Sequence, residues 1–237
     1  MPLPVKDSVE FAQLIDGLSS DVVYARTHLT LLRDLWVAEE QYSREFLQSQ
    51  TFWSLTRLAH GEAGTLKLAR AYDSHQHSLS LGTWLETIRD NLHLFSVEHF
   101  RERLKDNPFV ESLAESPRTP DAGVLRSDLA SVSRSEPTVS KLLLVRDNLI
   151  AHRSGKLVLQ GRNPFGVSGL SWDDLELLAN RALVILNRYS SLFAASTFSA
   201  KPVGNDDFVA LLALAKRGID ALDAEHQAEL GRLGGAS

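Results

Sequence analysis

The feature of this 237-residue sequence that most constrains its fold is the recurrence of apolar side chains every three or four residues. Between about Ser8 and Gln50, apolar and polar positions follow this spacing at Val22, Arg26, Leu29, Arg33, Trp36 and Glu40. A period near 3.6 places the apolar side chains on one face of a helix, whereas a strand alternates at every second residue. The stretch therefore predicts long helix, with Gly17 and Ser19-Ser20 as a candidate break inside it.

The helical pattern continues along the rest of the chain, and no set of strand-like segments interrupts it. Further helices are predicted at about 52–72, 81–94, 97–104, 123–133, 135–153, 171–198 and 206–231. Residues 107–123 are rich in Pro, Ser and Thr and predict a surface connection, and residues 156–170 predict a turn-rich loop. We therefore expect an all-α helical bundle that forms one domain over residues 1–237, with an additional C-terminal helix at 205–231.

Two helix starts carry local signals. Ser135-Glu-Pro137 supplies a capping residue followed by a proline in the first turn, where the missing N–H has no cost. Ser171-Trp-Asp-Asp174 places a capping serine before acids that favour the positive N-terminal end of a helix. Both signals lie next to the stretch with the most unusual chemistry.

Composition excludes several classes of site. Cysteine is absent, which rules out disulfides, thiolate-bound zinc or iron–sulfur clusters, and a cysteine nucleophile. Residues 1–7 lack the basic-then-apolar pattern of a signal peptide. The longest apolar runs, such as 142–145, fall far short of the roughly 20 residues that a bilayer requires. We therefore expect a soluble, cytoplasmic protein with no membrane partner.

The charge pattern also limits the partners. A formal net charge of −5 argues against a dedicated duplex-DNA-binding protein, which usually presents a broad basic face. One segment is locally basic, because Asp147 is the only acid among Lys141, Arg146, Arg153, Lys156 and Arg162. This pattern fits either a small site for an anionic substrate or a solvated polar face.

The most unusual stretch is Leu144-Val-Arg146-Asp147-Asn148-Leu-Ile-Ala-His152-Arg153, which places polar groups on an otherwise apolar helix. On an α-helix, Asn148 and His152 are four residues apart and share a face. An imidazole transfers a proton near neutral pH, and a guanidinium binds a phosphate through two hydrogen bonds. Cleavage of RNA without a metal needs these groups, since a base removes the 2′-hydroxyl proton and a cation stabilises the phosphorane charge.

The string from Arg146 to His152 resembles the Arg-x4–6-His motif of HEPN domains, the helical "higher eukaryotes and prokaryotes nucleotide-binding" superfamily. More narrowly, Arg146-Asp-Asn-Leu-Ile-Ala-His152 is similar to the AbiU2-like branch, named for a phage abortive-infection protein. In that branch, long N-terminal helices precede the motif helix and a helix that opens with acids follows it. The resemblance covers about residues 8–200 and implies a HEPN-like bundle with long antiparallel helices.

The resemblance implies a function and roles for five residues. Many HEPN members are metal-independent endoribonucleases of phage defence or toxins, with sites formed where the motif helices of two protomers meet. Arg146 would bind and polarise the scissile phosphate, and His152 would act as general base or acid. Asn148 or Asp147 would orient the histidine or the phosphate, and Arg153 would contact the RNA backbone. Asp147 would oppose phosphate binding unless it pairs with an arginine.

The implied partners are RNA or a nucleotide, a second copy of the chain, and an antitoxin protein, with no cofactor and no metal. Three other interpretations stay open. The first is a non-catalytic HEPN-like module that binds a nucleotide or a protein partner. The second is a small-molecule enzyme that uses the Arg–His pair on another anion. The third is structural: Arg146, Asp147 and Asn148 bridge neighbouring helices, and His152 closes a helix end near the negative pole of its dipole.

Other polar groups have plainer interpretations. His75-Gln-His77 brings two imidazoles together, but no carboxylate at helical spacing completes a metal motif, so we interpret it as an exposed loop. Arg57, Arg70 and Asp73 punctuate the second predicted helix and indicate an ion-pair network beside the motif helix. Residues 161–166 have neither the spacing nor the lysine of a phosphate-binding loop.

Overall fold

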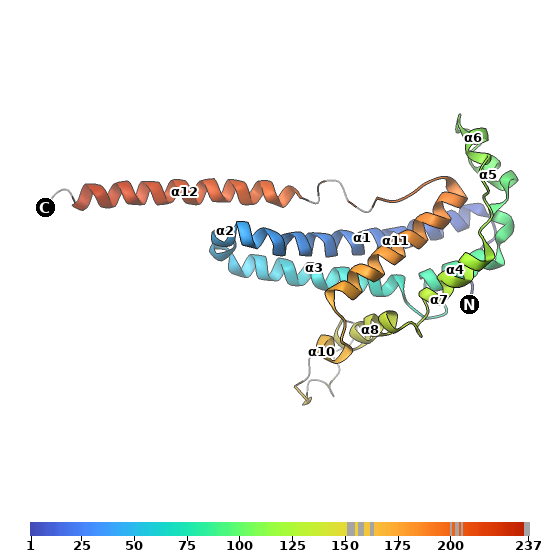
Figure 1. Ribbon diagram of the computed structural model, residues 1–237, viewed down its shortest axis with the longest axis horizontal. Coiled ribbons are helices and arrows are strands. Elements are labelled where there is room, and N and C mark those ends of the chain that lie inside the picture. The colour runs from blue at the N-terminus through green and yellow to red at the C-terminus, as the bar shows by residue number, and fades with distance from the viewer. Residues whose placement is uncertain are drawn as a thin grey trace. The chain divides into compact units, whose positions relative to one another are not determined.

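A computed structural model describes residues 1–150, 155, 159–161, 164–199, 201, 204 and 206–234 (Figure 1). Within these ranges every regular element is a helix, which confirms the all-α prediction. In chain order the elements are α1 (Ser8–Gln41), α2 (Ser43–Gln48), α3 (Gln50–Ala71), α4 (Leu81–Asp90), the 3-10 helix η1 (Leu92–Phe95), α5 (Val97–Arg103), α6 (Val110–Ala114), α7 (Ala122–Ser131), α8 (Pro137–Val145), the π-helix η2 (Arg146–Ile150), α10 (Pro164–Ser168), α11 (Trp172–Ala194) and α12 (Asp207–Gly234).

The chain divides into two compact units. Unit 1 comprises residues 1–26 and 62–200, and unit 2 comprises residues 27–61 and 201–237. Helices α1 and α3 therefore contribute to both units. The expectation of one domain over the whole chain stays a prediction.

Unit 1 is built around an aromatic core supplied by α1, η1, α4 and α11. The Phe11 ring lies 4.8 Å from that of Phe193 and 5.5 Å from that of Phe95, and Trp84 meets Tyr189 edge-on at 5.9 Å. All five side chains are at most 1% exposed. Burying each one stabilises the fold by about 1.5–3 kcal/mol relative to exposure. This core fixes α4 and α11, which flank the candidate site.

Helix α4 shows how local sequence and packing agree in unit 1. Ser80 caps it through a reciprocal pair of hydrogen bonds with Thr83, which satisfies N–H groups that have no partner inside the helix. Its apolar face consists of Leu81, Trp84, Leu85 and Ile88, all 0% exposed. The opposite side of α4 packs against α7, and the two ribbons lie side by side in Figure 1.

The predicted break near Gly17 is wrong, because α1 runs through it without interruption. A Cβ atom at residue 17 would lie 2.9 Å from the Cδ2 atom of Leu79. The glycine therefore makes room for the segment between α3 and α4 to approach α1, and it is not a helix end. Sequence alone cannot distinguish these two uses of glycine.

Several predicted boundaries also need correction. Residues 107–123 are not only a connection, since they contain α6, and the predicted loop at 156–170 contains α10. The cap of α8 is Glu136 rather than Ser135: its carboxylate accepts a hydrogen bond from the Val139 N–H at 2.7 Å, and Pro137 follows as predicted. Helix α11 begins after the predicted cap Ser171 but ends at Ala194, because Ala195 adopts a left-handed conformation with φ of 51°.

Unit 2 has its own small core where α1, α2, α3 and α12 meet. It consists of Leu35, Ala38, Tyr42, Phe46 and Leu212, with Leu31, Trp53 and Phe208 packed against it. Arg44 of α2 forms ion pairs with Asp220 and Asp223 of α12. From residue 220 to 233, every side chain of α12 is exposed. The structure thus contains the additional C-terminal helix, anchored by its first half.

Among the residues that the structure describes, no helix has both the length and the apolar character needed to cross a membrane.

Candidate functional site

The motif stretch begins where α8 ends. Helix α8 buries Val139, Leu142, Leu143 and Val145, and this packing fixes the position of the residue that follows. From Arg146 to Ile150 the backbone forms a π-helix, in which each turn is wider than in an α-helix. The predicted continuous α-helix is therefore wrong for these residues. The shared face of Asn148 and His152 stays a prediction. His152 and Arg153 lie outside the described residues, and their roles stay predictions.

Arg146 is held between two carboxylates. Its Nη1 atom lies 2.8 Å from Oδ1 of Asp73, and its Nε and Nη2 atoms lie 2.8 Å and 2.7 Å from Oδ1 of Asp147. The side chain is 17% exposed. Burial alone would lower the pKa of the Arg146 guanidinium, but the hydrogen bonds to Asp73 and Asp147 outweigh it and raise that pKa. The guanidinium is therefore charged and fixed in direction.

Asp73 is itself held by the turn that follows α3. Its Oδ1 atom accepts a hydrogen bond from the His75 backbone N–H at 3.2 Å, and its Oδ2 atom accepts one from the Ser78 hydroxyl at 2.9 Å. Burial would raise the pKa of Asp73, but the hydrogen bonds from Arg146, Ser78 and the His75 N–H lower it on balance. Asp73 is therefore ionised at neutral pH and oriented before any ligand arrives.

The ion pairs predicted for Arg57, Arg70 and Asp73 are present as three separate pairs, and only the Asp73 pair involves the motif stretch. Arg57 pairs with Glu39, Arg70 Nε lies 3.2 Å from Asp21 Oδ2, and Asp73 pairs with Arg146. Sequence reasoning did not assign Asp73 to Arg146. The available signal was a carboxylate placed directly after a helix end and followed by Ser and His, a pattern typical of a turn that orients its own acid.

A fourth charged residue, Arg134, completes the arrangement. Its Nη2 atom lies 3.8 Å from Oδ2 of Asp147, and its Nη1 atom lies 3.4 Å from Oγ of Ser74. Acids and bases therefore alternate along Asp73, Arg146, Asp147 and Arg134, which we call the Arg146 cluster. We expected Asp147 to oppose phosphate binding unless it pairs with an arginine, and it pairs with Arg146 and Arg134. Its role toward a substrate stays a prediction.

A family model described as AbiU2, of the HEPN type, matches residues 8–211. The chain belongs to the AbiU2 family of HEPN proteins. The match confirms the resemblance seen in the motif and extends slightly beyond residues 8–200. Neither the curated proteins nor the solved structures gave a match.

The locally basic segment of this HEPN protein, which begins at Lys141, is partly neutralised by acids from other parts of the chain. Lys141 Nζ lies 3.0 Å from Oδ2 of Asp174, and Arg146 lies between two acids. Asp147 is the only acid within this segment of the sequence, but Lys141 and Arg146 also pair with Asp174 and Asp73 from other parts of the chain. Arg153, Lys156 and Arg162 lie outside the described residues. The Asn148 amide donates a 2.8 Å hydrogen bond to the Leu144 carbonyl, one turn back along the chain.

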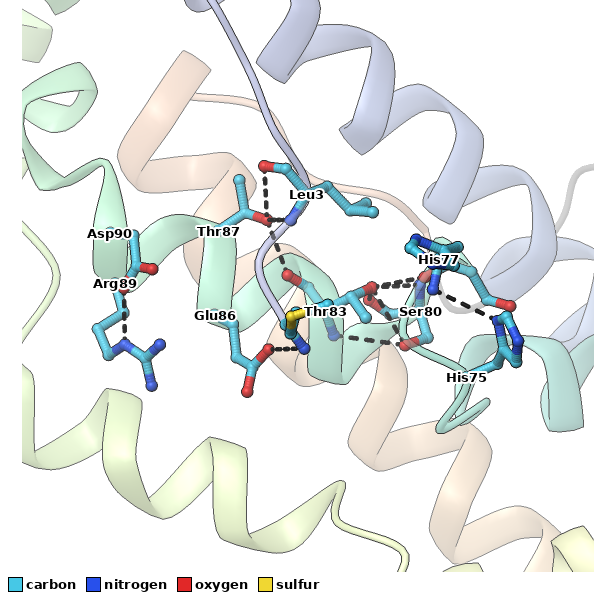
Figure 2. Close-up of polar contacts among 11 residues, drawn as sticks. Leu3, His75, His77, Ser80, Thr83, Glu86, Thr87, Arg89 and Asp90 are labelled. Atoms are coloured by element: carbon cyan, nitrogen blue, oxygen red, sulfur yellow. Dashed lines mark hydrogen bonds and ion pairs between the residues drawn. The ribbon is translucent and has the colours of Figure 1, made fainter.

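An open groove of about 420 Å³ adjoins the Arg146 cluster of the HEPN protein and shares Asp73 and Arg134 with it, and Ser74 also lines the groove. Its other walls come from α4 and from the end of α7. Figure 2 shows the α4 side, where Glu86 contacts the Met1 amino nitrogen at 2.6 Å and Arg89 donates to Asp90 at 2.8 Å. Sequence reasoning missed Arg89 and Arg134, because neither belongs to a motif.

The two imidazoles of His75 and His77 lie in the turn before α4, as Figure 2 shows, and both residues are exposed. This confirms the interpretation of His75-Gln-His77 as an exposed loop. In the part of the chain that the structure describes, no group of three or more His, Cys, Asp and Glu side chains is placed to hold a metal ion.

Proposed function

We propose that this HEPN protein is a metal-independent endoribonuclease that acts in phage defence or as a toxin, with an Arg146/His152 site completed in a cytoplasmic homodimer. Membership of the AbiU2 family supports the HEPN type of module. The observation that carries the proposal is the fixed orientation of Arg146 between Asp73 and Asp147. A guanidinium that is already oriented loses little entropy when it binds a phosphate.

In the proposed reaction, Arg146 binds the scissile phosphate. Its three ion-pair contacts use one N–H on each guanidinium nitrogen. Arginine has five N–H donors, so a second N–H on Nη1 and another on Nη2 lie outside these contacts. These two donors can bind phosphate oxygens and stabilise the charge that develops on them.

His152 supplies the proton transfer in this proposal. As a base it removes the proton of the 2′-hydroxyl, whose oxygen then attacks the phosphorus. The bond from phosphorus to the 5′-oxygen breaks, and that oxygen takes up a proton from an imidazolium, of the same residue or of its counterpart in the second protomer. The products are a 2′,3′-cyclic phosphate and a 5′-hydroxyl.

Asp147 is the feature that most opposes phosphate binding. Two carboxylates beside one guanidinium repel an anion, but Arg134 balances the second carboxylate, so the formal charges of the Arg146 cluster cancel. The cluster therefore orients Arg146 without a net negative charge. Asn148, Asp147 and Arg153 keep their proposed roles in orienting the histidine or contacting the RNA.

The same contacts favour one alternative function. Because Arg146 already has two carboxylate partners, a non-catalytic HEPN-like module that binds a nucleotide or a protein, such as an antitoxin, is the second candidate. In that case the Asp73–Arg146 pair would serve only to join the end of α3 to the motif stretch.

The test is an RNase assay with single-stranded RNA in EDTA, together with light scattering to measure the oligomeric state. We expect cleavage that leaves cyclic-phosphate ends, and a dimer. Arg146→Ala and His152→Ala should each abolish cleavage while keeping the helical circular dichroism. Arg101→Ala, an exposed arginine paired with Glu111, is the matched control and should cut normally. Undiminished cutting by either motif variant would contradict the assigned roles, and a dimer without turnover would favour the alternative.

A further inference from the structure

The groove beside the Arg146 cluster is lined by two arginines, by apolar side chains, and by two carboxylates that each pair with a cation. Arg89 projects from α4, and Arg134 follows the end of α7. Leu129, Ala130 and Val132 add apolar surface, and Gly82 leaves the α4 wall without a side chain. Ligand sites commonly combine such apolar lining with a few placed polar groups, in volumes of about 300–1,000 Å³.

Both groove arginines are accessible to a ligand. The Arg89 side chain is 50% exposed and the Arg134 side chain is 62% exposed. The Arg134 contacts are long, at 3.4 Å to Ser74 and 3.8 Å to Asp147, and are therefore weak. Arg89 uses its Nε atom on the neighbouring Asp90. A phosphate, which accepts bidentate bonds from arginine, is a stronger partner than either present contact of Arg134.

The position of the groove indicates a strand of nucleic acid as its ligand. The groove is open rather than enclosed, so a polymer can enter and leave it. It shares Asp73 and Arg134 with the Arg146 cluster, so a ligand in it lies against Asp73, which holds Arg146. The ribose and base of a nucleotide have apolar faces and polar edges, and the groove offers both apolar and polar side chains to contact them.

We propose that this groove binds the single-stranded RNA next to the scissile bond, with Arg89 and Arg134 as contacts to its phosphates. The inference rests on the proposed function, since it places the flanking nucleotide of that same substrate. Figure 2 shows the Arg89 guanidinium and the Glu86 carboxylate projecting from the same helix, and Glu86 pairs with the Met1 amino group. Arg134, between the groove and Asp147, is the residue that couples the two parts of the site.

The test measures binding separately from cleavage. Fluorescence anisotropy with a labelled 2′-O-methyl RNA strand, which lacks the attacking hydroxyl, gives the affinity of the full chain at several salt concentrations. We expect Arg89→Ala and Arg134→Ala each to weaken binding about tenfold, and each to reduce the slope of log affinity against log salt by about 0.7. Arg134→Lys should bind more tightly than Arg134→Ala but less tightly than the wild type. Lysine keeps the positive charge but lacks the planar guanidinium that binds a phosphate through two hydrogen bonds. Arg101→Ala is the control and should bind as the wild type does.

Three results with the RNA strand would overturn the inference: no binding by the wild type, unchanged affinity in both groove variants, or an equal loss of affinity in Arg101→Ala. A fourth is that the groove variants bind the RNA strand normally and lose affinity only for a free mononucleotide, measured in the same way. Thermal melting of each variant shows whether it is folded. The proposed function fails separately. If the wild type binds RNA through Arg89 and Arg134 but does not cut it, the groove is confirmed as an RNA-binding site and the proposed RNase activity is wrong. If the groove variants bind and cut RNA normally, the RNase activity is unaffected and the proposed role of the groove is wrong.

Discussion

Nη1 of Arg146 lies 2.8 Å from Oδ1 of Asp73, although the two residues are 73 positions apart in the sequence. The contact joins the turn after α3 to the first residue of the π-helical stretch. Both side chains are largely buried, at 17% and 20% exposure. An ion pair shielded from water in this way is stronger than a surface pair. It therefore determines where the motif arginine points.

Replacing Asp73 by Asn tests this contact. The amide keeps the shape and an acceptor but removes the charge, so Arg146 loses its charged partner on α3. We expect a loss of about 1–2 kcal/mol in the free energy of unfolding and a fall in RNA cleavage of about 10- to 100-fold. Urea denaturation and the RNase assay measure the two effects. Asp106→Asn, at an exposed position, should change neither. Cleavage at the wild-type rate by Asp73→Asn would show that the pair does not orient Arg146 for catalysis.

Replacing Arg146 by Lys separates charge from geometry. A lysine carries one nitrogen and cannot contact Asp73 through one atom and Asp147 through two others, as the guanidinium does. We therefore expect Arg146→Lys to cut RNA almost as poorly as Arg146→Ala, while its melting temperature stays closer to that of the wild type. Single-turnover cleavage rates compare the three proteins. A lysine variant with near wild-type rates would mean that a positive charge alone is sufficient.

The imidazoles of His28 and His60 predict a pH-dependent stability of unit 2. Their Nδ1 atoms lie 2.8 Å apart, so at least one ring must be neutral to accept the hydrogen bond. Burial lowers the pKa of His60. The unfolded chain therefore binds more protons than the folded one, and this contribution to stability is present above the unfolded pKa and lost as pH falls below it.

Urea midpoints at about pH 7.5 and about pH 5.5 measure the effect, since the unfolded histidine titrates at about 6.5. We expect the wild-type midpoint to fall more between these two conditions than the midpoint of His60→Gln. Titrating groups outside the His28–His60 pair are shared by both proteins and cancel in the comparison. Equal falls in the two proteins would mean that His60 does not titrate differently on folding.

Gly218 lies in the exposed part of α12 and offers a gain in stability. A Cβ atom there would meet nothing within 4 Å, and alanine is favoured over glycine inside a helix by about 0.8–1 kcal/mol. We expect Gly218→Ala to slow hydrogen exchange of the α12 amides by a factor that corresponds to about 1 kcal/mol. Gly17→Ala is the matched contrast, because its Cβ would lie 2.9 Å from Leu79 and the helix gain is offset. Equal gains at both positions would contradict this explanation.

Sequence periodicity predicted most helices because a helix is encoded locally, by residues three and four apart. It located α3, α4, α11 and α12 and the start of α1 to within several residues, but it extended the first helix to about residue 50, where the structure has the separate helix α2. It failed where distant contacts decide the structure. Gly17 has the pattern of a helix breaker until Leu79 is placed beside it. The chain after α11 is not helical as far as Phe198, whose N–H donates to the Asn187 side chain at 2.7 Å, a contact that helical periodicity does not encode.

For the candidate site, the motif identified Arg146 and its neighbours but not their partners. Asp73, Arg134 and Asp174 come from other helices or turns, and nothing in the residues around Arg146 specifies them. The π-helix was also missed, because its sequence remains compatible with an α-helix. Long-range ion pairs and helix irregularities are products of tertiary packing, so one sequence without relatives does not reveal them.

The ion pair between Lys141 and Asp174 has a consequence for how this part of the chain can evolve. Lys141 Nζ lies 3.0 Å from Asp174 Oδ2, and the same carboxylate accepts the Ser171 N–H. Residues 141 and 174 are thus held together, so the chain between them starts and ends at one place in unit 1. The entropic cost of closing such a length of chain grows only logarithmically, by about 0.6 kcal/mol for each doubling of its length. Insertions after His152 and before Ser171 should therefore cost little stability, and they offer a place where new specificity can arise without rebuilding the helices.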